Sequence, residues 1–492
     1  MVYEPKTRPF SHQRDEFAER GTMRSKGLLW EQGTGKTKET TDEVAAAYEG
    51  GEIDSAIVVA PNGVHQNWID DEYPVHLPDR IAEGAMSLTY HSSRAAQVGF
   101  GRQVSALQEH RDGLATLAIS YDGLMTPKGR KLIEWWLKHR RPAMILDEST
   151  RIKSPSAKRT HAIVAMGRRA RWKRILTGTP VPNGPMDIYA QIKFLDEDFW
   201  RDRGFASFEA FKTHFGIWKQ IETKQVDRRG RPRTFPKCVG YKHLNELQTI
   251  LQSITSRVTK EEVLDLPDKI FSPKSYELSA EQRRIYDALR DEFIAWLEDD
   301  DEVMTAQMAL VRMTRFRQIC AGFYQPDEAE APKFFKDNPK LDLLEEIAVD
   351  LPHQAIIWGS FRSEIDMILE RLEKNGLSYV RYDGAVPVGD ERQRAKERFN
   401  RGDAQFFVAN PAAAGMGLTL VGAKTTIYSS NSFDLDHRLQ SEDRNHRIGQ
   451  DVAVNYIDLV GRATIEVKLL QALRDKIRVA EQITGDDPRE WL

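Results

Sequence analysis

The chain has 492 residues, of which 40% are hydrophobic and 29% are charged, and its formal net charge is −3. These values are typical of a globular protein of two or three domains, and they predict no polyanionic partner by themselves. The longest apolar runs have only the length of a strand, the N-terminus does not resemble a signal peptide, and two cysteines cannot build a disulfide framework. We therefore expect a cytoplasmic protein that is neither secreted nor inserted in a membrane.

A glycine-rich turn near the N-terminus stands between a predicted strand at residues 27–30 and a predicted helix from about residue 36 to 48. Gly33 and Gly35 allow the backbone to bend so that several N–H groups point toward an anion. The partial positive charge at the N-terminus of the helix favours the same ligand. The segment therefore has the pattern of a phosphate-binding loop.

Two side chains at the end of this turn carry the chemistry that a nucleotide needs. Lys36 would reach the β- and γ-phosphates, and the Thr37 hydroxyl would bind Mg²⁺. Trp30 stands where the full pattern has a glycine. An ordinary glycine turn that caps a helix is therefore the alternative to a nucleotide site.

Further strands are predicted at 55–60, 115–120 and 143–146. After the first of them, Asn62 is expected to cap a helix that carries Trp68. Strands that alternate with helices at this spacing predict a parallel sheet with both faces covered.

The strand at 143–146 delivers two adjacent carboxylates, Asp147 and Glu148, to its C-terminal end. In parallel α/β sheets, that edge is where ligands bind. Asp147 would hold Mg²⁺, and Glu148 would orient or deprotonate the attacking water. The alternative is a pair of solvated acids at the end of a strand.

Three segments together resemble motifs I, II and III of superfamily two helicases, and more narrowly those of the Swi/Snf-like DNA translocases. These segments are residues 33–37, 147–153 and 176–180. The resemblance implies a bound ATP that contacts Gln13, Gly33, Thr34, Gly35, Lys36 and Thr37, with Mg²⁺ on Thr37 and Asp147. It also implies that residues 60–68 contact the nucleic-acid backbone.

One departure from the family pattern follows the acid pair. The family usually has Ala-His there, whereas this chain has Ser149 and Thr150. This difference leaves metal binding intact but puts in doubt how the second motif signals to the third.

Between residues 205 and 266 the alternation of strands and helices is lost, and a basic segment lies at 224–237. In the family that the chain resembles, helical protrusions and a linker occupy this position and contact the duplex. A disordered surface loop is the alternative for this segment. A second basic cluster, at 168–174, has a solvated charged surface as its alternative.

The second half of the chain begins with predicted helices and then returns to alternation. The predicted helices are 279–296, 341–351, 361–374, 390–399 and 464–480, and the predicted strands are 355–358, 379–382 and 405–409. This pattern predicts a second parallel α/β unit without a phosphate loop of its own. Such a unit most simply supplies residues to a nucleotide that the first unit holds.

Arg444 and Arg447 stand three residues apart, and on a helix they would share one face. Paired guanidinium groups suit a γ-phosphate whose charge spreads during transfer, although a charged surface helix is the alternative in isolation. Residues 440–450 resemble motif VI of the Swi/Snf-like branch, and residues 410–420 resemble motif V. The resemblance implies that both arginines act in catalysis and that Gln440 helps to bind the nucleotide.

These observations predict an α/β fold of two tandem RecA-like P-loop lobes, each a parallel sheet flanked by helices. A helical and basic insertion is expected between them. The predicted domains are an ATP-binding lobe at 1–200, a linker and insertion at 201–267, a helical protrusion at 268–335 and a second lobe at 336–492.

The function that the resemblance implies is an ATP-dependent motor on double-stranded DNA, with single-stranded DNA as a further candidate partner. One alternative is a strand-separating helicase in replication, recombination or repair. Another is a nucleic-acid-binding protein with an inactive ATP site, which the complete set of Lys36, Asp147, Glu148 and Arg447 disfavours. We expect a monomer, and the compact chain suggests a viral or prokaryotic setting, with the host cytoplasm as the compartment in the viral case.

Overall fold

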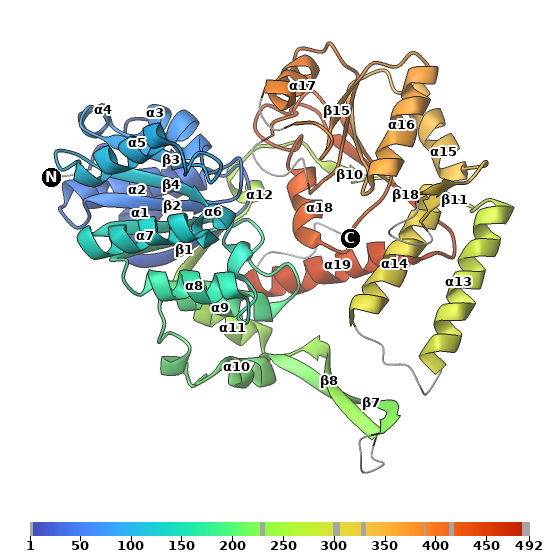
Figure 1. The fold of residues 1–492 in the computed structure, drawn as a ribbon, viewed down its shortest axis with the longest axis horizontal. Helices are drawn as coiled ribbons and strands as arrows, with labels where there is room; N and C mark the ends of the chain where they lie inside the picture. The colour runs from blue at the N-terminus through green and yellow to red at the C-terminus, as the bar shows by residue number, and fades with distance from the viewer. Residues whose placement is uncertain are drawn as a thin grey trace. The chain divides into compact units, whose positions relative to one another are not determined.

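The computed structural model describes residues 3–226, 232–298, 306–325, 331–387, 390–412 and 418–484. The chain forms two compact units, which Figure 1 shows as ribbons. The first unit comprises Met1–Ile217, Val239–Leu264 and Arg478–Leu492, and the second comprises Trp218–Cys238 and Asp265–Ile477. None of the described helices is long and apolar enough to cross a membrane.

The first unit is built on a parallel sheet of seven strands in the order β3-β4-β2-β5-β6-β1-β9. The strands are β1 (Ser25–Trp30), β2 (Ser55–Ala60), β3 (Met86–Tyr90), β4 (Ala115–Ser120), β5 (Pro142–Asp147), β6 (Trp172–Leu176) and β9 (Thr255–Val258). Successive side chains enter two separate cores, since Ile57 and Val59 pack on one face and Ala56 and Val58 on the other. A parallel sheet covered on both faces requires such continuous apolar strands.

Helices cover both faces of this sheet (Figure 1). The α-helices of this unit are α1 (Ser11–Arg20), α2 (Lys36–Glu49), α3 (Tyr73–His76), α4 (Asp79–Ala82), α5 (Val98–Glu109), α6 (Tyr121–Met125), α7 (Pro127–His139), α8 (Lys158–Gly167), α9 (Ile188–Leu195), α10 (Phe208–Phe215), α11 (Leu244–Gln252) and α12 (Lys260–Val263). A two-stranded hairpin, β7 (Gly216–Val226) and β8 (Pro232–Tyr241), connects α10 to α11.

The second unit is also built on a seven-stranded parallel sheet, in the order β10-β18-β17-β14-β16-β15, with β11 paired to β18. Its strands are β10 (Lys269–Phe271), β11 (Lys274–Tyr276), β14 (Ala355–Trp358), β15 (Tyr379–Tyr382), β16 (Phe406–Ala409), β17 (Thr425–Tyr428) and β18 (Val454–Gly461). A separate pair, β12 (Phe323–Tyr324) and β13 (Lys333–Phe334), is antiparallel. The helices are α13 (Ala280–Glu298), α14 (Ala306–Ala321), α15 (Pro339–Asp350), α16 (Arg362–Lys374), α17 (Asp390–Asn400), α18 (Leu435–Glu442) and α19 (Ile465–Thr484), of which α19 belongs to the first unit from Arg478 on.

Two parallel α/β sheets confirm the predicted fold of two RecA-like lobes. One local prediction is wrong: Asn62 caps no helix, because its amide instead donates to the Asp122 carboxylate at 2.9 Å. Trp68 begins a short π-helix, Trp68–Glu72, whose N-cap is Asn67. The strand β9 lies in the region where the sequence pattern indicated no alternation. Of the basic segment at 224–237, residues 227–231 lie outside the described residues.

Candidate functional site

The strand register brings the ends of β1, β6 and β5 to one edge of the first sheet. Leu28 pairs with Leu176, and Leu176 pairs with Asp147. The glycine-rich turn follows the end of β1, the Thr-Gly-Thr-Pro turn follows Leu176, and the acid pair begins with Asp147 itself. The three segments that resemble helicase motifs I, II and III therefore leave the sheet side by side.

The glycine-rich turn closes around the ammonium group of Lys36. Gly33 and Gly35 have φ values of +84° and +87°, a region that residues with a Cβ rarely adopt. Gly35 is the N-cap of α2 and has no side chain that could form a capping hydrogen bond. Lys36 Nζ donates to the carbonyl oxygens of Trp30 at 2.7 Å and Glu31 at 2.9 Å. The cation is thus held at the N-terminus of α2, where an anion is favoured.

Helix α1 is attached to the same turn by two side chains. Gln13 is almost fully buried, and its Nε2 donates to the Gly35 carbonyl at 2.9 Å while its Oε1 accepts from the Phe10 N–H at 2.8 Å. His12 Nε2 donates to the Thr34 carbonyl at 2.8 Å. A Cβ on Gly35 would lie 2.2 Å from Gln13 Nε2, so this contact requires glycine.

Asp147 lies at the end of β5 and accepts a hydrogen bond from the Trp68 indole N–H at 2.9 Å. Tyr121 OH donates to the Asp147 carbonyl at 3.0 Å and so fixes the backbone at this point. Burial raises the pKa of the Asp147 carboxyl, while the Trp68 hydrogen bond and the charge of Lys36 oppose that shift. A cation or a metal at this carboxylate would favour its ionised form further.

Glu148 is buried and has a φ of 53°, an uncommon conformation for a residue other than glycine. Gln32, on the glycine-rich turn, approaches it with Nε2 3.4 Å from Glu148 Oε1. The turn and the second acid are therefore in direct contact. The two carboxylates have different partners, Trp68 for Asp147 and Gln32 for Glu148.

The Thr-Gly-Thr-Pro turn packs against the glycine-rich turn. A Cβ on Gly178 would lie 3.3 Å from the backbone nitrogen of Gln32. Arg257, on β9, donates to the Leu29 carbonyl at 2.6 Å and to the Gly178 carbonyl at 3.2 Å. It also forms an ion pair with Glu31 at 3.3 Å. One guanidinium group thus ties both turns together.

A buried hydrogen-bond chain connects the acid pair to the Thr-Gly-Thr-Pro turn. Ser149 Oγ donates to Gln191 Oε1 at 2.7 Å, and Gln191 Nε2 donates to the Pro180 carbonyl at 2.7 Å and the Asp187 carbonyl at 2.8 Å. Ser149 and Gln191 are fully buried. The serine that departs from the family pattern is therefore the point at which the two segments are joined.

Beneath the glycine-rich turn, α2 carries a buried network of charges. Lys26 forms ion pairs with Glu16 and Glu43, and Arg174 Nε lies 2.6 Å from Glu43 Oε2. Burial, followed by the charge of Glu43, raises the pKa of Glu39 to about 10, so that carboxyl is protonated at neutral pH. Arg174, which belongs to the basic cluster at 168–174, is therefore a core residue rather than a surface one.

In the second unit, Arg444 and Arg447 lie in the turn that follows α18 rather than on the helix itself. They still lie together, because Nη1 of each donates to the Leu418 carbonyl, at 3.3 Å and 3.2 Å. Arg444 is buried and Arg447 is half-buried. Gln440 is buried on α18, and its Nε2 donates to the Asp436 carboxylate at 3.0 Å.

Residues 410–420, which resemble motif V, are described only in part, since 413–417 lie outside the described residues. Asn410 donates to the carbonyls of Gly359 at 3.2 Å and Ser360 at 2.8 Å. This contact joins the segment to the turn that follows β14.

Several residues of the first site were not predicted. Trp68 was expected near the nucleic-acid backbone, but it is buried beside Asp147. The contacts of Gln32, Gln191 and Arg257 carry no signal in the sequence, because amides and guanidinium groups occur at many surface positions. Only the packing of distant segments brings them to the site.

The hydroxyl of Thr37 and the carboxylate of Asp147 are hard oxygen donors, which Mg²⁺ prefers. Thr37 lies on the first turn of α2 and Asp147 at the end of β5. The chemistry of this donor set fits a magnesium ion bound together with phosphate oxygens.

Comparison with known proteins identifies the family. The sequence profile of the SNF2-related domain matches residues 17–324, more than half of the chain, and that of the helicase conserved C-terminal domain matches residues 339–449. The chain belongs to the SNF2-related family. Proteins of this family hydrolyse ATP, and the chain is accordingly an ATP-hydrolysing enzyme of the helicase type.

Relatives of this SNF2-family chain are longer proteins. It is 25% identical over 470 residues to a chromodomain-helicase-DNA-binding protein 1-like of Danio rerio, covering 92% of this chain and 41% of that protein. It is 26% identical over 477 residues to the DNA annealing helicase and endonuclease ZRANB3 of Mus musculus, covering 94% of this chain and 40% of that protein. The chain thus spans about two fifths of the length of these relatives.

Among solved structures, the chain is similar to the Sulfolobus solfataricus SWI2/SNF2 ATPase core in complex with dsDNA. The two are 22% identical with a TM-score of 0.42, and the match covers 99% of this chain and 95% of that chain.

Proposed function

We propose that this SNF2-family chain is a motor that uses ATP hydrolysis to move along double-stranded DNA. The observation that carries the proposal is the convergence of Lys36, Asp147 and Glu148 at one edge of the first sheet. Gln32 contacts Glu148 from the glycine-rich turn, and the charge of Lys36 acts on the Asp147 carboxyl. A site that had lost its activity would not be expected to retain this complete set.

In the proposed site, Lys36 exchanges its two carbonyl partners for the β- and γ-phosphates of ATP, while the amides of residues 33–37 hold phosphate oxygens. Thr37 and Asp147 would hold Mg²⁺, which supplies positive charge to the phosphate oxygens. Glu148 orients the attacking water and accepts its proton. Gln13 would read adenine, which requires its amide to give up the contacts with Phe10 or Gly35.

We further propose that Arg444 and Arg447 of the second unit stabilise the charge that develops on the γ-phosphate. Their shared partner, the Leu418 carbonyl, keeps the two guanidinium groups together. An arginine that acts in this way typically accelerates phosphoryl transfer by about 10³–10⁵-fold. The less buried Arg447 is the better candidate for direct contact, and Arg444 would position it.

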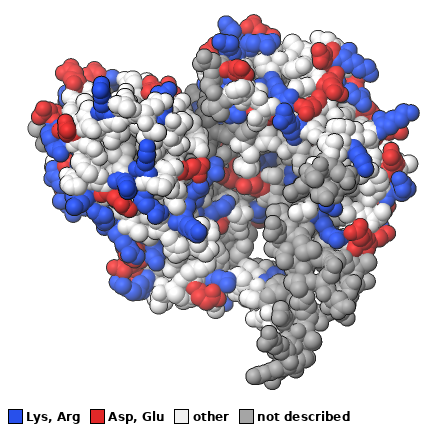
Figure 2. Space-filling view, viewed as in Figure 1, with Lys and Arg blue, Asp and Glu red and all other residues white. Residues whose placement is uncertain are grey.

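The relatives' names support DNA as the polymer, because one is called a DNA annealing helicase and the other a helicase-DNA-binding protein. On the face that Figure 2 shows, Lys and Arg are interspersed with Asp and Glu. We therefore expect DNA binding to depend on a limited set of phosphate contacts rather than on net charge, and to weaken as salt rises. The proposed setting is the cytoplasm, and the proposed state is a monomer.

The test is phosphate release by the intact chain with no nucleic acid, single-stranded DNA, duplex DNA and RNA. Stimulation by duplex DNA that Lys36→Ala abolishes supports the motor. Absence of turnover under every condition would leave only a binding protein.

Two further assays separate motor from helicase. Displacement of a third strand from a DNA triplex without separation of the duplex supports translocation. Separation of the duplex strands instead would favour the unwinding helicase.

A further inference from the structure

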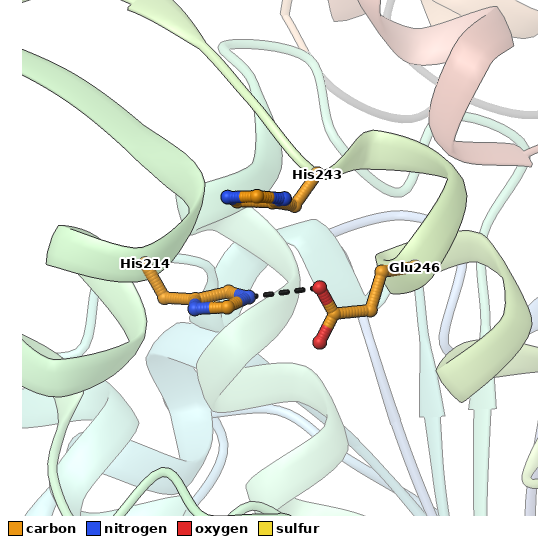
Figure 3. Close-up of side chains that lie close together, drawn as sticks. All are labelled: His214, His243 and Glu246. Atoms are coloured by element: carbon orange, nitrogen blue, oxygen red, sulfur yellow. Dashed lines mark hydrogen bonds and ion pairs between the residues drawn. The ribbon is translucent and has the colours of Figure 1, made fainter.

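Three side chains with metal-binding atoms lie together in the first unit, outside the candidate nucleotide site. They are His214 near the end of α10, His243 directly before α11, and Glu246 on the first turn of α11. Each offers one ligand atom, and these atoms all lie within 4.8 Å of one another. Figure 3 shows the two imidazole rings one above the other, with the Glu246 carboxylate beside the ring of His214.

The positions of these groups leave them able to converge on one ion. His214 Nε2 is hydrogen-bonded to Glu246 Oε2 at 2.9 Å, and the two imidazole rings stack with centroids 4.7 Å apart. The ring of His214 is half-buried and packs edge-on against Phe205, at 5.1 Å between centroids. His243 and Glu246 are exposed, so their side chains can turn toward the fixed ring without disturbing the core.

The donor set selects the kind of ion. Two imidazole nitrogens and one carboxylate oxygen suit Zn²⁺ and similar divalent transition metals, whereas Ca²⁺ and Mg²⁺ prefer sites made of oxygens. Zinc–ligand bonds of about 2.0–2.2 Å in a tetrahedral site place the ligand atoms about 3.4 Å apart. The ligand atoms now lie within 4.8 Å of one another, so the exposed side chains of His243 and Glu246 have to rotate to reach that spacing. Three protein ligands leave a fourth position for water.

The place of the cluster in the fold gives such an ion a structural effect. His214 lies two residues before the hairpin β7–β8, and His243 lies two residues after it. The two ends of the hairpin are already joined by the hydrogen bond from the Lys242 N–H to the Phe215 carbonyl at 3.0 Å. On the last residue of β8, Tyr241 OH donates to the Asn183 carbonyl at 3.0 Å, in the loop that follows the Thr-Gly-Thr-Pro turn.

We propose that His214, His243 and Glu246 bind one divalent transition-metal ion, best matched by Zn²⁺, and that this ion fixes the base of the β7–β8 hairpin. The ion cross-links the end of α10 to the start of α11. It thereby holds Tyr241 against the loop at Asn183. The site is independent of the nucleotide, since none of the residues proposed to bind ATP takes part in it.

The test is a metal titration of the intact chain after treatment with a chelator, without ATP or DNA and in excess Mg²⁺ so that Thr37 and Asp147 are not available. Co²⁺ is the probe because its visible absorption reports tetrahedral coordination, and Zn²⁺ should displace it. We expect one equivalent to bind. We also expect His243→Asn and Glu246→Gln each to weaken binding by at least about 10-fold. Asparagine is chosen because it tolerates the positive φ of 58° at His243.

Two control variants remove other groups that bind metals. His139→Asn removes an exposed histidine that stacks on Trp135, and Cys238→Ser removes the thiol on β8. Both should bind cobalt as the unaltered chain does. In a second measurement, zinc should slow proteolysis at the hairpin in the unaltered chain and not in His243→Asn.

Failure to bind one equivalent of cobalt would overturn the proposal. So would equal affinity in the unaltered chain, His243→Asn and Glu246→Gln, since the cluster would then be only a His–Glu ion pair. Either result leaves the proposed motor function intact, because the titration contains neither nucleotide nor DNA.

Discussion

The C-terminal edges of the two sheets show how one fold can serve two purposes. In the first unit, the helix after β1 begins at Lys36, and its N-cap residue, Gly35, has no side chain to cap it. In the second unit, the helix after β14 is α16, and its own Glu364 fills the corresponding position. Glu364 accepts from the Ser360 N–H at 2.9 Å and from the hydroxyls of Ser429 at 2.6 Å and Ser430 at 2.7 Å.

The difference lies in where the anion comes from. A helix N-terminus after a parallel strand favours a negative charge in both units. The second unit supplies that charge from its own sequence, whereas the first unit presents a cation and two glycines to an external phosphate. We infer that the first unit binds the nucleotide and that the second contributes arginines to it.

The largest expected effect comes from Glu148, on the edge that is open to a ligand. Glu148→Gln keeps the shape of the side chain but removes the proton acceptor, so turnover should fall by about 10²–10⁴-fold. ATP affinity should be retained, because the variant leaves Lys36 and Asp147 unchanged. Phosphate release and nucleotide binding, measured on the same preparation, check this. Unchanged turnover would remove Glu148 from the mechanism.

The next largest effect is expected in the second unit, where Glu364 lies at the N-terminus of α16. Glu364→Ala removes a fully buried carboxylate that accepts from four donors, of which the Ser360 N–H also donates to Ser430 Oγ, so we expect a loss of about 3–5 kcal/mol in the free energy of unfolding. Urea unfolding of the intact chain, followed by far-ultraviolet circular dichroism, measures it. Glu373→Ala, an exposed acid on the same helix, is the matched control and should change stability by less than about 0.5 kcal/mol.

A smaller change in the free energy of unfolding, which is a gain rather than a loss, is expected when the buried Glu39 under the glycine-rich turn is replaced. Because the pKa of Glu39 is raised to about 10, the folded chain keeps a proton that the unfolded chain releases above its ordinary value of about 4.5. This group therefore lowers stability progressively as pH rises from about 4.5 to 10 and has no such cost below that window. Glu39→Gln should stabilise the chain by about 1–3 kcal/mol at pH 8.

Glu43→Gln is the comparison variant for Glu39→Gln, because it replaces the neighbouring buried acid. It breaks the ion pairs of Glu43 with Lys26 and Arg174 and should therefore destabilise the chain. Urea unfolding at pH 5 and pH 8 gives both values. If Glu39→Gln is no more stable at pH 8 than at pH 5 relative to the unaltered chain, Glu39 is ionised in the folded state.

The smallest effect is expected at the link between the acid pair and the Thr-Gly-Thr-Pro turn. Ser149→Ala leaves the buried Gln191 Oε1 without its donor, at a cost of about 1–2 kcal/mol. If the link matters for the reaction as well, stimulation of ATP hydrolysis by DNA should fall more than the basal rate. Ser149→Ala and Gln191→Ala, measured alone and together, form a cycle, and additive effects on stability and stimulation would show that the two side chains are not coupled.

Much of the fold could be predicted because its strands are continuous apolar runs. The segments 55–60 and 115–120 were predicted with the bounds that the structure has. By contrast, β9 is a short strand with a single fully apolar residue, Val258, and it joins the sheet only through its pairing with β1. Its position depends on the register with Gly27 and Trp30, which no local pattern contains.

The site was predictable to the extent that its residues lie in local motifs. Asp147 ends β5, Glu148 follows it, and Lys36 follows the turn after β1, so their positions follow from the topology of a parallel sheet. Trp68 and Arg257 act through contacts with segments far away in the sequence, so only the folded chain reveals them. The turn that holds Arg444 and Arg447 shows the same limit, since three-residue spacing predicted a helical face and the helix ends at Glu442.

The division of labour between the units is tested most directly by comparing Lys36→Ala with Arg447→Ala, with ATP binding and DNA-stimulated phosphate release measured for each. Our account predicts that Lys36→Ala loses both, whereas Arg447→Ala binds ATP as the unaltered chain does and loses phosphate release. Phosphate release by Arg447→Ala at the rate of the unaltered chain would contradict it.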